Sequence, residues 1–376
     1  MDIDDAWDEF IHSTDNDFVS NHKEEEEVMN VMPKCGDIYI STKTKIIYMK
    51  LYSKDEEVKE YMDINTLFWK IPVLDYYTQK NGIIKKQIKI TATTPEESDN
   101  INEMLKSETI YQRDVLHDSH RGKKYKKVEK ISCGLCKKDF LTVRSKRKSA
   151  FYNCFALVIR IRDKDTFKEM HVKVFNSGKI EIPGIQEDTI LQSGLSILKS
   201  LISDITHYRV EYQMNTVETV LINSNFTCGF YINRDKLFKK LKMKYGLITM
   251  FDPCSYPGIQ SKFYYNKNKE TQDGICHCEH RCSKGGKGNG EGHCIEVSFM
   301  IFRTGSVLIV GRCEEYVLYK TYHFIKEILE REYMEINDGN ISLEDVKVKT
   351  IKKTKKIQIT VENNIESIYN GTSVQC

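Results

Sequence analysis

The feature that most constrains how this chain folds is an internal repeat. Two segments, Phe175-Asn-Ser-Gly178-Lys-Ile-Glu-Ile-Pro-Gly and Phe302-Arg-Thr-Gly305-Ser-Val-Leu-Ile-Val-Gly, share the pattern F-x-S/T-G-x-I/V-x-I-x-G and lie 127 residues apart. A glycine between two β-rich runs suits a tight hairpin, in which a positive φ angle is needed. Self-similarity at a fixed spacing indicates a duplicated structural unit.

A helix is predicted after each hairpin, at the same spacing. Apolar residues recur there at i, i+4, i+7 and i+11, which places them along one side of an α-helix. The two stripes are Leu191, Leu195, Leu198 and Ile202, and Leu318, Tyr322, Ile325 and Leu329. Such a helix buries its apolar side, and the neighbouring antiparallel sheet is the surface at hand. The sequence therefore predicts an α+β fold built from two similar units.

Strand alternation divides the residues before each turn between two faces of the sheet. The apolar sets are Val172 and Val174 in the first unit, and Val297, Phe299 and Ile301 in the second. Phe175 and Phe302 fall on the other face in both units. A single phenylalanine in this position commonly covers the edge of a core. Its recurrence in both units favours a binding surface instead.

Around these motifs the chain resembles the TATA-box-binding protein (TBP) family. The resemblance rests on Phe155-Ala-Leu-Val-Ile-Arg-Ile-Arg, Val174-Phe175-Asn-Ser-Gly, Tyr256-Pro-Gly-Ile and Ile301-Phe302-Arg-Thr-Gly. Large insertions and a Lys/Ile/Asn-rich composition are similar to the divergent TBP-like proteins of large nucleocytoplasmic DNA viruses. The resemblance implies a two-lobed saddle of curved antiparallel sheet, with amphipathic helices on its convex face, in a monomer with pseudo-twofold symmetry.

The resemblance also implies a function, namely binding and bending of AT-rich double-stranded DNA through its minor groove. The aromatic wedges would be Phe155, Phe175, Tyr256 and Phe302, and further DNA contacts are expected from Asp37, Thr219, Lys173, Arg160 and Lys179. Asp37 and Thr219 stand where the family has two asparagines. An ionised aspartate offers only acceptors, as do the A·T edges in the minor groove. Duplex binding is therefore better supported than reading of a TATA sequence.

By the same resemblance, the expected partners are transcription-initiation factors or RNA polymerase. The alternative is a protein-interaction or virion scaffold module that has lost TATA-specific DNA binding. The sequence carries no Walker loop, G-x-S-x-G, H-E-x-x-H or kinase motif, so we do not expect an enzyme. No apolar run approaches ~20 residues and the first residues are acidic, which favours an intracellular, reducing location in a nucleus, viral factory or virion over secretion or a membrane.

Twelve cysteines are a high number for a chain expected in a reducing compartment. Cys276, Cys278, Cys282 and Cys294 flank a Gly/Lys-rich segment with few apolar residues. Four thiolates suit a closed structural zinc site. A loop with free thiols and a disulfide remain alternatives. The pair Cys133-Gly-Leu-Cys136 lacks a visible second pair, so its cysteines are interpreted as structural or free.

Charge and motif positions predict four regions. Residues 1–34 carry eleven acidic side chains against two lysines and are expected to form a disordered arm, either solvated or competing with DNA for a basic face. The first lobe is expected over 35–210 with an insertion around 52–130. The second is expected over 211–335 with the cysteine-rich insertion around 267–293. A basic tail, 336–376, follows. The basic body fits a nucleic-acid partner or a solvated lysine-rich surface.

Overall fold

The computed structural model describes residues 34–59, 61–121, 124–141, 151–280, 282, 286–288 and 292–338. Its strands are β1 (Tyr39–Tyr52), β2 (Val58–Lys59), β3 (Gly82–Ala92), β4 (Tyr111–Arg121), β5 (Lys124–Gly134), β6 (Cys154–Asp163), β7 (Thr166–Phe175), β8 (Lys179–Ile185), β9 (Arg209–Thr227), β10 (Ile248–Met250), β11 (Ile259–Tyr265), β12 (Ile295–Ile301) and β13 (Ser306–Gly311). Its helices are α2 (Ile64–Lys70), α3 (Pro95–Leu105), α4 (Lys137–Leu141), α5 (Asp188–Thr206), α6 (Arg234–Lys239), the π-helix η1 (Lys240–Lys244) and α7 (Glu315–Ile336).

These strands form one antiparallel sheet of thirteen strands, in the order β10-β11-β12-β13-β9-β1-β8-β7-β6-β3-β5-β4, with β2 paired to β1. The predicted combination of helices with an antiparallel sheet is therefore confirmed. Both hairpin glycines have the expected positive φ, 77° at Gly178 and 81° at Gly305. A Cβ at either position would lie about 2.2 Å or 2.3 Å from a backbone carbonyl oxygen, so glycine is required there.

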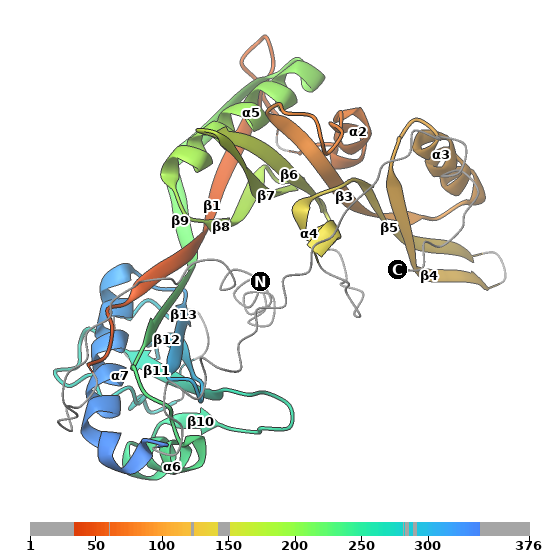
Figure 1. Cartoon of the computed structure of the whole chain (residues 1–376). Coiled ribbons are helices and arrows are strands. Elements are labelled where there is room, and N and C mark those ends of the chain that lie inside the picture. Colours follow the sequence, from red (N-terminus) through yellow and green to blue (C-terminus); the bar gives the residue numbers. More distant parts are fainter. Residues whose placement is uncertain are drawn as a thin grey trace. The chain divides into compact units, whose positions relative to one another are not determined.

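The first core lies between α5 and the strands that α5 covers, β6 to β9 (Figure 1). The predicted stripe of α5 is buried throughout: Leu191, Leu195, Leu198 and Ile202. Val172 and Val174 meet it from β7, as strand alternation predicted. The helix ends at His207, whose left-handed conformation (φ 59°) stops further helical hydrogen bonding.

The second core lies beneath α7, which packs on β13 and the neighbouring strands. Its predicted stripe is also buried: Leu318, Tyr322, Ile325 and Leu329. Val297, Phe299 and Ile301 of β12 belong to the same core, in agreement with the predicted parity. Near the end of α7, Glu332 is buried and accepts hydrogen bonds from Lys240 and Lys244 at 2.6 Å each and from Tyr245 at 2.5 Å.

A long ladder between β1 and β9 joins the two cores. Residues from Tyr39 to Tyr52 pair with residues from Asn225 back to Arg209. The end of β1 enters the first core through Ile47 and Met49, whereas its beginning packs on the second core through Ile40. β1 therefore contributes apolar side chains to both cores.

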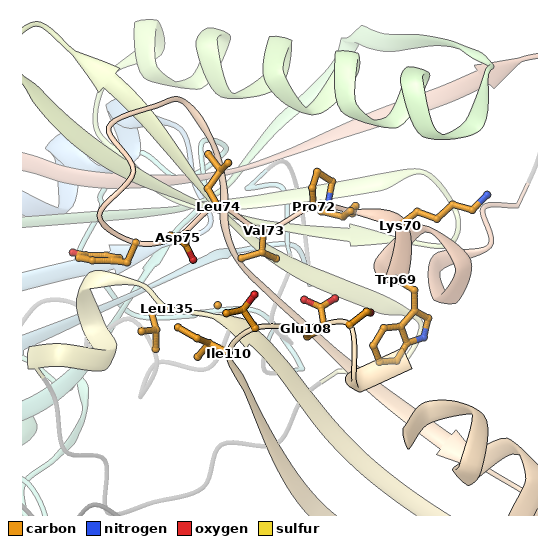
Figure 2. A pocket seen from close by; sticks show the side chains of 14 residues that line it. Trp69, Lys70, Pro72, Val73, Leu74, Asp75, Glu108, Ile110 and Leu135 are labelled. Atoms are coloured by element: carbon orange, nitrogen blue, oxygen red, sulfur yellow. The ribbon is translucent and has the colours of Figure 1, made fainter. Parts of the chain in front are cut away.

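The segment expected as an insertion, 52–130, extends the sheet. Asp63 caps α2, accepting hydrogen bonds from the backbone of Asn65 and Thr66, both at 3.1 Å. β3 then pairs directly with β6, and β5 and β4 follow it outward. A cavity of about 250 Å³ lies between the loop after α2 and the chain around Glu108 and Leu135 (Figure 2).

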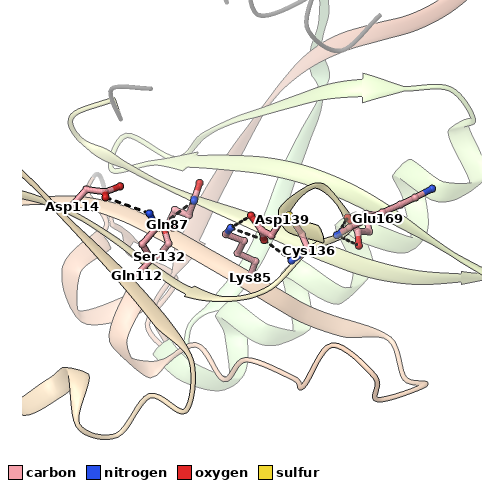
Figure 3. Close-up of polar contacts among 9 residues, drawn as sticks. Lys85, Gln87, Gln112, Asp114, Ser132, Cys136, Asp139 and Glu169 are labelled. Carbon is pink, nitrogen blue, oxygen red and sulfur yellow. Dashed lines mark hydrogen bonds and ion pairs between the residues drawn. The ribbon is translucent and has the colours of Figure 1, made fainter. Parts of the chain in front are cut away.

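The short helix α4 is fastened over β3 and β7 by polar contacts (Figure 3). Lys85 Nζ bonds both carboxylate oxygens of Asp139, at 2.6 and 2.7 Å. The backbone N–H of Lys137 donates to Glu169 at 2.9 Å, and that of Cys136 donates to Asp139 at 2.7 Å. Beneath lies a small apolar cluster of Ile84, Cys136 and Val158, with Leu74 and Tyr76 against it. This cluster covers part of the sheet face that α5 leaves uncovered.

Two predicted regions fall outside the described residues. These are the acidic arm before Lys34 and the basic tail beyond Asp338. Among the helices that are described, none combines the length and apolar character needed to cross a membrane.

Candidate nucleic-acid interface

The strand register defines a second face of the sheet, turned away from α5 and α7; we call it the opposite face. Residues directly across from each other in an antiparallel pair point to the same side. Ala156, Lys173 and Glu181 form one row across β6, β7 and β8, and Cys154 faces Phe175 in the next row. Because Val172 and Val174 point into the first core, these rows belong to the opposite face.

In the second half, the opposite face carries an aromatic pair on an apolar base. The rings of Tyr256 and Phe302 lie 6.1 Å apart between centroids, at an interplanar angle of 58°. Both pack against a cluster made of Leu221, Met300, Leu308 and Val310. A Cβ on Gly258 would lie 2.8 Å from Phe302 Cε1 and 3.0 Å from Tyr256 Cε1. Glycine at 258 therefore allows the two rings to approach each other.

In the first half, the expected pair of Phe155 and Phe175 does not form. Phe175 is half-buried on the opposite face, with Lys179 Nζ 5.1 Å from its ring centroid. Phe155 is fully buried in the first core, directly across from Val174. The prediction that Phe155 is a wedge was wrong, because a residue next to Cys154 on the strand must point to the other side of the sheet.

Two exposed aromatic residues missed in the sequence lie near lysines of β3 and β7 on the same face. Phe151 and Tyr152 are 53% and 57% exposed. Lys173 Nζ lies 4.6 Å from the ring centroid of Phe151, and Lys89 Nζ lies 3.5 Å from that of Tyr152. Their signal in the sequence was an aromatic pair immediately before the β6 motif, but they precede the segment that carried the repeat.

The four cysteines of the second insertion come together. Their sulfur atoms all lie within 4.8 Å of one another, with separations of 3.4 Å for Cys278–Cys282, 3.6 Å for Cys278–Cys294 and 4.0 Å for Cys276–Cys294. Backbone N–H groups of Gly292 and Cys294 point at the sulfurs of Cys278 and Cys282, both at 3.3 Å. The cluster packs on buried Tyr264.

The thiols of this cluster differ in acidity. Burial alone would raise the pKa of Cys276, but backbone N–H groups of Cys282 and Cys278 lower it to about 7. Burial raises the pKa of Cys294. Outside the cluster, burial raises the pKa of Cys133 to about 12 and that of Cys136 to about 11. Both of these side chains are buried, which agrees with a structural role for the C-x-x-C pair.

Comparisons with known proteins show what the chain is similar to. No family model matches it. The chain is 23% identical over 216 residues to a curated protein named TATA-box-binding protein-like from Acanthamoeba polyphaga mimivirus. The match covers 52% of this chain and 53% of that protein, so the chain spans about half the length of its curated relative. The predicted resemblance is confirmed. Over this stretch the chain is similar to a divergent viral TBP-like protein.

Among solved structures, Methanococcus jannaschii TBP matches with 12% identity and a TM-score of 0.35. That match covers 78% of this chain and 99% of the archaeal chain. A score at this level does not establish a shared fold.

Of three basic residues expected to contact DNA, one is covered by a loop. Arg160 is only 6% exposed, because it donates to the carbonyl oxygen of Thr78 at 2.8 Å and packs on Tyr76. The loop before β3 thus covers its guanidinium, and the prediction that Arg160 contacts DNA was wrong. Lys173 and Lys179 do reach the opposite face, where Lys173 also pairs with Glu181 at 2.8 Å.

Asp37 and Thr219 do not form the expected central pair. Thr219 pairs across the sheet with Lys45, whose Nζ lies 2.7 Å from Asp188 at the start of α5. Thr219 therefore belongs to the helix-covered face. Asp37 is exposed and precedes the first residue of β1. For Thr219 the reason is a bulge in the β1–β9 ladder, where Thr44 pairs with Leu221 but Lys45 pairs with Thr219.

Proposed function

We propose that this chain is a DNA-binding transcription-initiation factor that binds the minor groove of duplex DNA with its opposite face and bends it. The observation that carries the proposal is the Tyr256–Phe302 pair, fixed on an apolar base and turned away from α7. Similarity to the mimivirus TBP-like protein supports the same class of ligand. Inserting such side chains costs a few kcal/mol per unstacked base step, which contacts along the bent duplex repay.

The proposed architecture is a two-lobed saddle with pseudo-twofold symmetry in a monomer. Equivalent hydrogen bonds support it, since the backbone N–H of Met49 donates to Gly178 O at 2.8 Å and that of Cys228 donates to Gly305 O at 2.9 Å. Each glycine turn is also followed by a strand and then by a long helix, α5 or α7. The β1–β9 ladder would lie at the centre of the saddle.

The test combines affinity and bending. Mobility shifts and end-labelled FRET are measured on AT-rich and GC-rich duplexes of equal length. We expect binding with bending, and a loss of affinity on the order of 5–100-fold for Phe302→Ala, since stacking contributes ~1–3 kcal/mol per base. Phe251→Ala, which changes an aromatic residue packed on the second core, is the matched control. A wild-type protein that neither binds nor bends any duplex contradicts the proposal.

A second function, a protein-interaction or virion scaffold, is favoured by two observations. Arg160 is committed to a loop, and neither Asp37 nor Thr219 supplies a central groove-reading contact. Partners that co-purify after nuclease treatment, together with the absence of a DNA footprint, would select this function. In either case we propose a binding role and not a catalytic one.

Partners and location are proposed from the same similarity. The helix-covered face would recruit initiation factors or RNA polymerase while the opposite face holds DNA. The place of action would be a nucleus or a viral factory, with packaging in the virion as the alternative. Nuclease-resistant association with polymerase in infected cells would test the recruitment.

The cysteine cluster is proposed to hold a structural zinc ion. Tetrahedral Zn²⁺ with bonds of about 2.3 Å to four sulfurs requires sulfur–sulfur separations of about 3.8 Å. Three of the six separations, at 3.4, 3.6 and 4.0 Å, bracket that value, and all six are within 4.8 Å. The N–H groups of Gly292 and Cys294 would stabilise the thiolate charge. Four sulfur ligands leave no open position, so the ion would brace the β11–β12 connection and would not catalyse a reaction.

A further inference from the structure

The first half exposes an aromatic surface in which two of the three rings, Phe151 and Tyr152, lie outside the family resemblance. Phe151, Tyr152 and Phe175 each have a lysine over or beside the ring, at centroid distances of 4.6, 3.5 and 5.1 Å respectively. The three lysines, Lys173, Lys89 and Lys179, come from β7, β3 and the start of β8. We call these six residues the aromatic–basic surface.

The local backbone explains why these rings stay exposed. Asn153 has a left-handed conformation, with φ of 59°, and its carbonyl oxygen accepts a hydrogen bond from Asn176 N at 3.0 Å. Asparagine tolerates this conformation far better than a β-branched residue does. The turn directs the chain away from the line of β6, so Phe151 and Tyr152 escape the strand alternation that buries Phe155.

The surface is joined to the opposite face. Cys154 lies directly across from Phe175, and its Sγ lies 4.0 Å from the carbonyl oxygen of Phe151. Lys173 connects the two rows, since it lies over Phe151 and also pairs with Glu181 at 2.8 Å. Phe151 and Phe175 therefore flank the same two side chains, Cys154 and Lys173.

We propose that the aromatic–basic surface binds unstacked or unpaired nucleobases, with its lysines near the adjoining phosphates. This inference rests on the proposed DNA binding and adds a preference to it. Exposed aromatic rings accept any base, because every base has a π face, and lysines beside them match the charge of the backbone. The second half holds a compact pair on an apolar base, whereas the first half offers rings spread along a turn. The first half should therefore favour a site end that is already weakly stacked.

The preference follows from the cost of exposing a base. Unstacking is cheapest at a mismatch and at flexible pyrimidine–purine steps. A duplex with one mismatch near one end should therefore bind more tightly than the fully paired duplex. The mismatched base should lie over the first half, where the rings can hold it without a tight pocket.

The experiment measures anisotropy on two AT-rich duplexes that differ by one terminal-region mismatch, with 2-aminopurine beside the mismatch as a stacking reporter. We expect wild-type protein to prefer the mismatched duplex about tenfold, and Phe151→Ala and Tyr152→Ala each to remove most of that preference. Tyr77→Ala is the control, since Tyr77 is a 75% exposed tyrosine outside this surface.

A second pair of variants tests the positioning role of Asn153. Asn153→Gly keeps the left-handed conformation accessible and should keep the preference, whereas Asn153→Val disfavours it and should lose the preference and the 2-aminopurine signal. Circular dichroism spectra of both variants should match the wild-type spectrum, which checks that they fold.

The outcomes separate the two proposals. A protein that binds and bends paired DNA but shows no mismatch preference overturns this inference and leaves the proposed function standing. Equal losses in Tyr77→Ala and Phe151→Ala also overturn it. A wild-type protein that binds no duplex overturns both.

Discussion

The two halves of the sheet treat their aromatic residues differently. In the second half, Tyr256 comes from the loop before β11 and meets Phe302 on the opposite face. In the first half, Phe155 comes from within β6 and is buried in the core, while Phe175 remains on the opposite face. The difference shows that strand alternation fixes the face to which an aromatic residue inside a strand points, whereas a residue in a loop is free of this constraint. The loop-borne rings of the first half, Phe151 and Tyr152, follow the same rule.

The cysteine cluster should give the largest difference between the two halves, because among the described residues only the second half carries such a cluster. Chelation of zinc, or Cys278→Ser, should unfold the β11–β12 connection, since metal binding supplies folding free energy of several kcal/mol. Hydrogen exchange should show lost protection from Lys262 to Glu296 and little change in β7. Cys254→Ser, at an exposed cysteine, is the control. Equal effects of both variants, or protein without bound zinc, would contradict the proposal.

Removal of Phe155 should separate stability from DNA binding. Phe155→Ala leaves a cavity in the first core and should lower the free energy of unfolding by ~3–5 kcal/mol. Urea denaturation measures the loss. Phe302→Ala, at a half-buried position, should cost far less stability but should reduce DNA bending. If the two variants exchange these effects, the assignment of faces is wrong.

The pH dependence of the free energy of unfolding should show the stabilising contribution of Glu332, which lies in the second half. Burial opposes ionisation there, but hydrogen bonds from Lys240, Lys244 and Tyr245 lower its pKa from 4.5 to about 2. A depressed pKa stabilises the fold above about pH 4.5, and this contribution is lost as the pH falls towards 2. Glu332→Gln should cost about 2 kcal/mol at pH 7. The difference between variant and wild type should shrink in acid, as measured by urea denaturation at each pH; a constant difference would refute the pairing.

The smallest expected effect concerns the spacing of the aromatic pair. Gly258→Ala would place a methyl group 2.8 Å from Phe302 Cε1 and push the rings apart. We expect a stability change of about 1 kcal/mol or less, with a measurable decrease in the FRET bend angle. Gly36→Ala is the matched control, because Gly36 has no positive φ and a Cβ there would lie 3.5 Å from Thr227 O, an ordinary contact. An unchanged bend angle would show that the pair need not be tight.

Much of the fold was predictable because it depends on periodicity. The stripes of α5 and α7, the parity of Phe175 and Phe302 and the glycine turns follow from local rules, and all are confirmed. For the four cysteines the sequence left a zinc site, free thiols and a disulfide open, and the structure brings their sulfur atoms together.

The errors arose where distant segments decide the outcome. Arg160 is covered by a loop some eighty residues earlier in the chain, which no local pattern reveals. Thr219 turned to the helix-covered face because bulges shift the β1–β9 register. Phe155 was misassigned because the resemblance was followed one residue too far, although alternation alone would have paired Cys154 with Phe175. Family likeness supplied the residue types, and strand parity decided their direction.

The crossing of β1 and β9 between the two cores bears on how the chain folds during synthesis. The first core needs Val210 and Tyr212 from β9, so it cannot close until most of the first 212 residues have been made. The segment from Cys35 to Ile40, which includes the start of β1, can pack only when the second core forms, and the last helix of that core ends at Ile336. Neither half, cut at the boundary near residue 210, carries all the strands of its own core. Expressed separately, each half would expose an unfilled apolar edge, so we expect the two halves to fold only when produced together.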